Sequence, residues 1–173
     1  MKTEFHKADP AQLQENAIHL IGQDWMLVTA GTLADFNTMT ASWGGLGELW
    51  SRQVAFIFVR PQRYTYQFLE RSKHFTLSFF TETYREALNF CGIHSGRNVD
   101  KMEATDLTPV ETDMGAVTFK EARLVFVCRK VYAQDLRGDH FTVPDIDAEI
   151  YPRKDYHRWY VGEIVRCLTR EVG

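Results

Sequence analysis

One stretch of the sequence groups residues that suit a flat ligand with a negatively charged tail. It opens with hydroxyl and small side chains over residues 37–45, crosses an apolar segment over 54–59, and ends in Arg60, Arg63 and Tyr64. Guanidinium groups donate in a fixed fork to phosphate oxygens, and short hydroxyl side chains and backbone N–H groups add donors without crowding. Composition alone favours a plainer reading, a β-hairpin with a glycine-rich turn and solvated arginines.

No other grouping in the sequence has the spacing of a catalytic centre. The six histidines are scattered, and an isolated histidine is more often a surface or core residue than a metal ligand. The cysteines, Cys91, Cys128 and Cys167, are odd in number, far apart and free of Cys-x-x-Cys spacing, so neither disulfides nor a zinc site is expected. Such a protein would rely on a cofactor for the difficult chemistry and would itself supply binding, orientation and electrostatics.

Length and charge set the class of protein. The 173 residues fit one domain spanning 1–173, and the formal net charge of -3 gives no field that favours nucleic acid or an anionic membrane. The sequence has no apolar signal segment at its start and no apolar run of membrane-spanning length. We expect a cytoplasmic protein with reduced thiols, whose anion site is a local cluster of Arg60, Arg63, Arg97 and Lys101.

The apolar pattern predicts about six strands and a few short helices. Strands are expected over residues 25–31, 38–42, 54–59, 75–80, 122–133 and 159–165, the first two forming a hairpin. Helices are expected after Pro10, from near Pro61, from a Thr83/Glu86 capping box to Gly92, and over 100–103. Residues 106–117 and 144–152 read as an irregular crossing and an acidic loop. This content favours a β-barrel over a layered α/β sheet.

Three separated motifs run from Asn37 to Gly47, from Val59 to Thr65 and from Cys91 to Lys101, within matching segments from about Trp25 to Glu163. In this order they resemble the flavin reductase-like, FMN-binding split-barrel family, most closely its flavoredoxin-like branch. The resemblance implies a mainly β fold, a split β-barrel of Greek-key type with a few short peripheral helices. It also implies a homodimer with FMN near the interface.

The resemblance assigns flavin-binding roles along these motifs. Residues of the first motif would line the isoalloxazine edge, those of the second would hold the phosphate or ribityl chain and flank the ring, and those of the third would complete a phosphate cradle. The candidates are Met39, Thr40, Ala41, Ser42 and Trp43, then Arg60, Arg63, Tyr64 and Thr65, then Ser95, Gly96 and Lys101. Each motif also has a structural explanation without a ligand. The first would be an ordinary strand end whose tryptophan covers the barrel, the second a solvated helix start with a core tyrosine, and the third a loop with a surface cation.

His157 is the candidate catalytic residue. In flavin reductases of two-component monooxygenases a Gly-Asp-His run precedes a Gly-Glu pair, and here Asp155-Tyr156-His157 stands at the same distance from Gly162-Glu163 with only the histidine retained. We expect His157 to contact nicotinamide or flavin, with an ordinary strand-entry residue as the alternative. The literal Gly138-Asp139-His140 is not followed by Gly-Glu at that spacing and is interpreted as a decoy.

The expected function is that of an FMN-binding oxidoreductase of the flavin reductase or flavoredoxin type. A hydride would pass from NADH or NADPH to the flavin, and electrons would pass on to free flavin, a monooxygenase or another acceptor protein. One alternative is a non-catalytic flavin binder or electron carrier. Another is a β-barrel binder of a different aromatic ligand, which the 13% aromatic content also suits.

Overall fold

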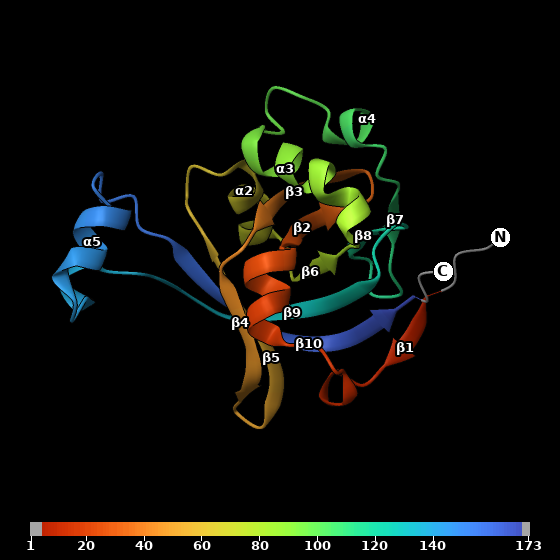
Figure 1. The fold of residues 1–173 in the computed structure, drawn as a ribbon, viewed down its shortest axis with the longest axis horizontal. Coiled ribbons are helices and arrows are strands. Elements are labelled where there is room, and N and C mark those ends of the chain that lie inside the picture. Colours follow the sequence, from red (N-terminus) through yellow and green to blue (C-terminus); the bar gives the residue numbers. More distant parts are fainter. Residues whose placement is uncertain (1–4, 171–173) are drawn as a thin grey trace.

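The fold is seen in a computed structural model that describes residues 5–170. Its main element is an eight-stranded antiparallel sheet. Seven strands run in the order β3-β2-β6-β9-β10-β5-β4, and the eighth, β1, pairs with β10. The strands are β1 (His6–Ala8), β2 (Met26–Thr32), β3 (Asp35–Ala41), β4 (Gly44–Leu49), β5 (Arg52–Val59), β6 (His74–Phe79), β9 (Leu124–Asp135) and β10 (Arg158–Thr169). Figure 1 shows how they curl around one another.

The sheet closes into a barrel that is split along one seam. Its two edge strands, β3 and β4, are joined by only Ser42 and Trp43, so the end of β3 and the start of β4 lie within about 11 Å of each other. No ladder pairs β3 with β4 in the described residues. The sheet therefore rolls until its edges meet at this connection and then part, which confirms the predicted split β-barrel.

Short helices and a small second sheet lie around the barrel. The helices are α1 (Ala17–His19), α2 (Tyr64–Arg71), α3 (Arg85–Ile93), α4 (Lys101–Thr105) and α5 (Pro144–Ile150), and β7 (Pro109–Glu111) pairs with β8 (Val117–Phe119). In Figure 1, α2, α3 and α4 gather near β2 and β3, whereas α5 projects on a lobe between β9 and β10. Within residues 5–170, no helix combines the length and apolar character needed to cross a membrane.

The core has two parts, one on each face of the sheet. Along β9, Leu124, Phe126 and Cys128 belong to one buried cluster, and Val125 and Val127 belong to the other. This alternation follows from the two-residue period of a strand, and it explains why the sequence there is continuously apolar. The three cysteines are buried and free, and burial raises the pKa of the Cys91 and Cys167 thiols to about 11.

Central strand β5 is covered less evenly than its sequence predicts. Val54, Ile57 and Val59 are buried, but Phe56 and Phe58 on its outer face are only partly covered. Their rings stack on Trp159 at centroid distances of 6.2 and 6.5 Å. The prediction of a strand buried on both faces is therefore wrong for this outer, aromatic face.

Several predicted boundaries also prove wrong. Residues 144–152, expected as a loop, contain α5, whose early proline and first-turn acids favour a helix start. Residues 44–47, a glycine-rich turn in the plainer interpretation, belong to β4 (Gly44–Leu49), and the hairpin turn lies at Trp50 and Ser51, both with positive φ. The described residues hold ten strands, whereas about six were predicted. The four that were not predicted, β1, β4, β7 and β8, are short or rich in glycine and proline.

Two helix starts and one helix end also differ from their predicted positions. Helix α2 begins at Tyr64, three residues after Pro61. The Thr83/Glu86 capping box does not form, because Glu82–Tyr84 is a 3-10 turn and α3 begins only at Arg85. That helix continues one residue past Gly92.

Candidate functional site

A hollow of about 210 Å³ opens where the two edges of the barrel meet. It gathers most of the predicted site residues from three places in the chain. Its lining is Met39, Thr40, Ala41, Ser42, Trp43, Phe58, Arg60, Arg63 and His157. We call it the seam cavity.

Strand register explains why these residues meet. Val59 of β5 pairs with Arg158 of β10, so Arg60 and His157 each lie one residue beyond a paired position at the same end of the barrel. Gly44 of β4 pairs with Ile57, which brings the neighbouring Trp43 to the same end of β5. A Cβ at Gly44 would lie 2.6 Å from the Phe56 carbonyl oxygen, so this close approach requires glycine.

Trp43 and His157 form the aromatic wall of the seam cavity. Their ring centroids are 5.3 Å apart, and Trp43 is 49% exposed whereas His157 is buried. His157 Nδ1 lies 2.8 Å from the hydroxyl oxygen of Tyr151. Burial lowers the pKa of His157 to about 4, with the Arg60 charge acting in the same direction and Asp155 opposing it. The imidazole is therefore uncharged at neutral pH.

The two arginines of the cavity have different surroundings. Arg60 donates to Asp155 Oδ2 at 2.5 Å and to the Ile150 carbonyl oxygen at 2.9 Å, and its guanidinium lies 5.3 Å from the Tyr151 ring centre. Arg63 is half-buried, and its side chain has no hydrogen bond or ion pair to any residue in 5–170. Burial lowers the pKa of Arg63. Arg63 is thus the cation of this cavity that still lacks a counter-ion.

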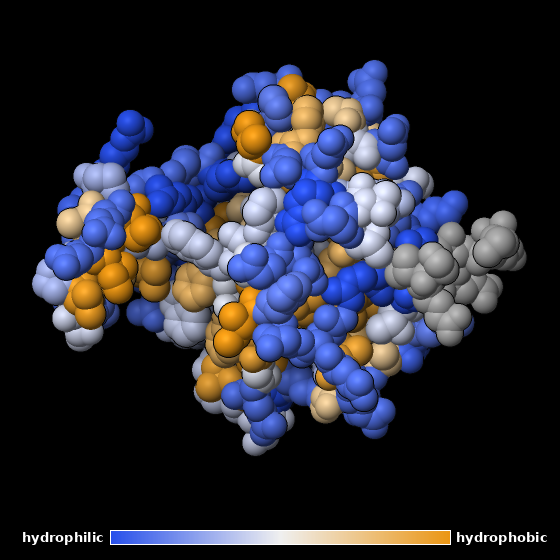
Figure 2. Space-filling model, in the orientation of Figure 1, coloured by the Kyte–Doolittle hydropathy of each residue, from blue (hydrophilic) through white to orange (hydrophobic). Residues whose placement is uncertain are grey.

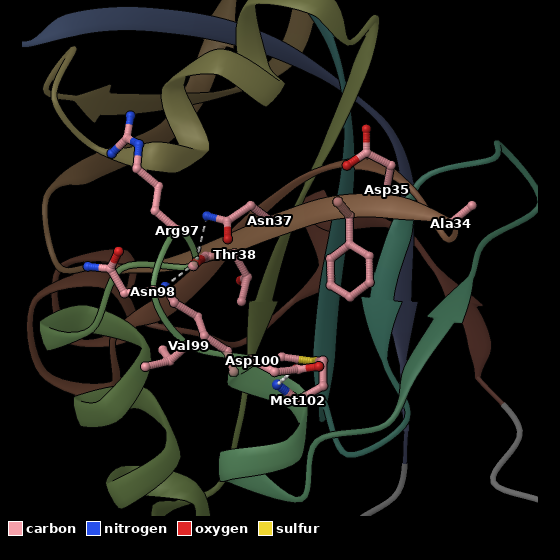
Figure 3. A pocket seen from close by; sticks show the side chains of 12 residues that line it. Ala34, Asp35, Asn37, Thr38, Arg97, Asn98, Val99, Asp100 and Met102 are labelled. Atoms are coloured by element: carbon pink, nitrogen blue, oxygen red, sulfur yellow. Dashed lines mark hydrogen bonds between the residues drawn. The ribbon is translucent and has the colours of Figure 1, made fainter.

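A second, polar hollow of about 510 Å³ lies between the first half of β3 and the segment leading into α4 (Figure 3). It is lined by residues 34–38 and 96–102, and we call it the loop cavity. Lys101, 6% exposed, donates from Nζ to the Thr38 carbonyl at 2.6 Å and the Cys91 carbonyl at 2.9 Å. Burial lowers the pKa of Lys101 to about 8, and the nearby Arg63 charge adds to this effect.

The remaining predicted residues hold the 95–101 segment in place. Thr65 is buried and its hydroxyl accepts a 2.7 Å hydrogen bond from Asn37. A Cβ at Gly96 would overlap the Asn37 side-chain oxygen. The Tyr64 ring packs against Phe68 and lies under the Arg97 guanidinium, 4.7 Å from its carbon. The Ser95 carbonyl and hydroxyl oxygens accept from Asn98 N and Arg97 N in a tight turn.

The family model described as the flavin reductase like domain matches residues 18–172. The chain belongs to this family. No curated protein matches the chain significantly.

Solved structures share the flavin reductase like fold at low sequence identity. The FMN-binding domain of a flavin reductases-like enzyme from Shewanella baltica is 14% identical in sequence and has a TM-score of 0.70. The match covers 98% of this chain and 78% of the Shewanella chain. Flavoredoxin from Methanosarcina acetivorans is 20% identical with a TM-score of 0.66, covering 95% and 77%. The Streptomyces globisporus NADH:FAD oxidoreductase, in complex with NAD and FAD fragments, is 20% identical with a TM-score of 0.64, covering 86% and 77%.

The free edge of β3 adds backbone groups to this candidate site. Because β3 is a terminal strand of the sheet, alternate residues direct N–H and C=O groups away from β2. The Thr38 carbonyl, bonded to Lys101, is one such group, and Thr40 lies two residues further along the same strand. An exposed backbone edge can donate to, and accept from, the polar rim of a planar ring.

Two residues of the site were not singled out from the sequence. Phe58 was assigned only to a buried strand, but it lines the seam cavity. Tyr151 fell in a segment interpreted as a loop, but it is buried against His157. The density of aromatic residues at 151 and 156 was the one available signal that the 144–157 segment is packed.

Proposed function

We propose that this member of the flavin reductase like family binds FMN, with the ring in the seam cavity and the phosphate between Arg63 and the 95–101 segment. FMN bound there would supply the redox chemistry, taking a hydride from NADH or NADPH and passing electrons to an acceptor. The protein binds and orients the two nucleotides. Backbone donors of β3 would offset the negative charge that develops on the reduced ring.

The observation that most supports this proposal is the unpaired Arg63. A half-buried guanidinium without a counter-ion is unfavourable, and a phosphate dianion would remove that cost. Lys101 lies close enough for the Arg63 charge to lower its pKa further, and neither side chain forms an ion pair with a carboxylate among residues 5–170. Two neighbouring cations without acidic partners favour an anionic ligand at this position.

The dimensions and lining fit a flavin. Trp43 and Phe58 give the seam cavity aromatic walls beside the free edge of β3, and planar aromatic ligands prefer such surfaces. Ligand cavities commonly measure about 300–1,000 Å³, and the loop cavity of about 510 Å³ gives a phosphate tail room beyond the smaller seam cavity. The names of solved relatives, which mention FMN-binding, flavoredoxin and NADH:FAD oxidoreductase, support the same ligand class.

Visible spectroscopy tests this proposal. We expect added FMN to bind with a perturbed absorbance spectrum, and NADH or NADPH added under anaerobic conditions to bleach it. A bound flavin that neither nucleotide bleaches would contradict the oxidoreductase and favour an electron carrier or passive flavin binder. No binding of FMN, in a protein shown to be folded, would favour a barrel for a different aromatic ligand.

We further propose that the protein is a homodimer through its outer aromatic face. Trp50 and Tyr132 are 57% and 40% exposed and pack edge to face, and Tyr132 packs on Trp159. Figure 2 shows hydrophobic residues over the α5 lobe and near the β4–β5 hairpin, where Val143 and Ile146 are 52% and 43% exposed. Exposed apolar groups of this kind mark interaction sites.

Sedimentation velocity tests the dimer. We expect a dimer for the wild-type protein and a shift toward monomer for Trp50→Ser. Ile18→Ser is the control, because Ile18 is 86% exposed on helix α1 and not on the β4–β5 hairpin. A wild-type protein that sediments as a monomer at micromolar concentration would contradict the proposal.

A further inference from the structure

Tyr151 is held rigidly against the one histidine of the seam cavity. It is 3% exposed, and its ring centroid lies 5.0 Å from that of Tyr156 and 5.3 Å from the Arg60 guanidinium carbon. Arg60 is itself fixed by Asp155 and by the Ile150 carbonyl oxygen. The tyrosine hydroxyl therefore has little freedom to turn away from His157 Nδ1, 2.8 Å distant.

The hydrogen bond between these residues has a preferred direction. Among residues 5–170, His157 Nδ1 is the only hydrogen-bond acceptor of the Tyr151 hydroxyl. If Nδ1 carried a proton, the buried O–H would have no acceptor, which is unfavourable. The phenol therefore donates and Nδ1 accepts. In a neutral imidazole the ring proton then resides on Nε2.

The second ring nitrogen of His157, Nε2, is accessible. His157 Nε2 has no hydrogen bond to a described residue, and the buried polar side-chain atoms without partners in residues 5–170 are Asp155 Oδ1, Arg158 Nε and Arg170 Nε. Nε2 is not among these buried atoms, so it is open to solvent. Since His157 lines the seam cavity beside Trp43, we infer that Nε2 is reached from that cavity.

We propose that Tyr151 is a positioning residue that fixes His157 as an uncharged Nε2–H donor toward a carbonyl or carboxamide oxygen of the ligand in the seam cavity. The identity of that oxygen, on a nicotinamide or a flavin ring, rests on the proposed function. The position of the proton on the His157 ring does not rest on the proposed function. A neutral donor orients a carbonyl without adding a third positive charge beside Arg60 and Arg63.

The surrounding charges are compatible with this role. Arg60 and Arg63 contribute positive charge and Asp155 contributes negative charge, while burial raises the pKa of Tyr151 so that its phenol stays protonated. Burial is also the main cause of the low pKa of His157, about 4. A hydrogen bond donated to Nδ1 favours the neutral ring, because that nitrogen must lose the bond when it takes a proton.

Nitrogen NMR of the flavin-free protein tests the proton position directly. In the wild type we expect His157 Nδ1 to resonate as an unprotonated nitrogen and Nε2 as a protonated one. In Tyr151→Phe we expect a mixture of tautomers and a His157 pKa higher by roughly half to one pH unit. Tyr156→Phe is the matched control, because its hydroxyl bonds Asp147 Oδ1 at 2.7 Å and not His157.

Two results of this experiment would overturn the proposal. One is a wild-type ring protonated on Nδ1, which needs no variant to observe. The other is a His157 titration that Tyr156→Phe moves as much as Tyr151→Phe does. Because no flavin is present, these results are independent of whether the protein reduces flavin.

Anaerobic bleaching of bound FMN by NADH or NADPH tests the consequence for the reaction. We expect Tyr151→Phe to slow bleaching roughly tenfold, as the loss of about 1.4 kcal/mol would, with FMN affinity changed less than twofold. In a His157→Gln background the same substitution should have no further effect, because Tyr151 acts through His157. Equal slowing in both backgrounds would overturn the positioning role. A wild type that is not bleached would instead count against the proposed function and leave the NMR result standing.

Discussion

Arg63→Ala is expected to weaken FMN binding by about 1.5–3 kcal/mol, which is roughly a tenfold to 150-fold rise in Kd. The reason is that Arg63 is half-buried without a counter-ion among residues 5–170, so a charged hydrogen bond to phosphate would be its first strong interaction. Arg60 has already made such interactions with Asp155 and Ile150. Fluorescence titration of FMN measures the change.

Two controls separate phosphate binding from a general effect of charge. Riboflavin has the same ring without the phosphate, so Arg63→Ala should leave its affinity nearly unchanged. Arg137→Ala removes the same charge from the segment between β9 and β10, where Arg137 pairs with Asp139 on the surface, and should leave FMN affinity nearly unchanged. An equal loss for riboflavin and FMN would show that Arg63 does not hold the phosphate.

Gly162→Ala is expected to lower the free energy of unfolding by about 1–3 kcal/mol through overpacking. The added methyl group would lie 2.5 Å from Phe75 Cζ and 2.7 Å from Cys128 Cβ. Both neighbours are buried, so the crowding can be relieved only by moving the ring or the strand. The register of β10 with β9 already shifts between Val161 and Gly162, which leaves little room for adjustment.

Urea denaturation measures this loss, and the chain offers a matched control. Gly47 lies in strand β4 with no atom within 4 Å of an added Cβ. Gly47→Ala should therefore be neutral or stabilising by up to about 1 kcal/mol, since it lowers the entropy of the unfolded chain. Similar losses in both variants would mean that contact with Phe75 and Cys128 does not account for the loss.

The environment of Gly162 also gives a physical meaning to the spacing between His157 and the Gly-Glu pair. Gly162 admits the Phe75 ring to β10, and Glu163 accepts hydrogen bonds from Arg52 at 2.6 Å and Arg129 at 3.0 Å. These contacts tie β10 to β5 and β9. The pair thus fixes the register of β10, and that register sets where His157, one residue before the strand, enters the seam cavity.

The sequence by itself determined the six longer apolar strands, β2, β3, β5, β6, β9 and β10, and the grouping of residues 39–43. Both follow from local properties: a two-residue apolar period defines a strand, and consecutive residues at a strand end must share a location. Continuous burial along β9 and the three ordered motifs were visible for the same reason. They led to the split barrel and to the family to which the chain belongs.

Only the tertiary structure decided how the predicted site is divided and which of its charges are free. Arg60 and Arg63 have the same local pattern, but Asp155, 95 positions after Arg60, engages only Arg60. Lys101 is drawn inward by the carbonyls of Thr38 and Cys91, so it lines the loop cavity and not the seam cavity. The proton on His157 depends on Tyr151, which the sequence placed in a loop. Each of these partners is chosen by sheet register and loop packing between distant segments, and the types and spacing of neighbouring residues do not encode that choice.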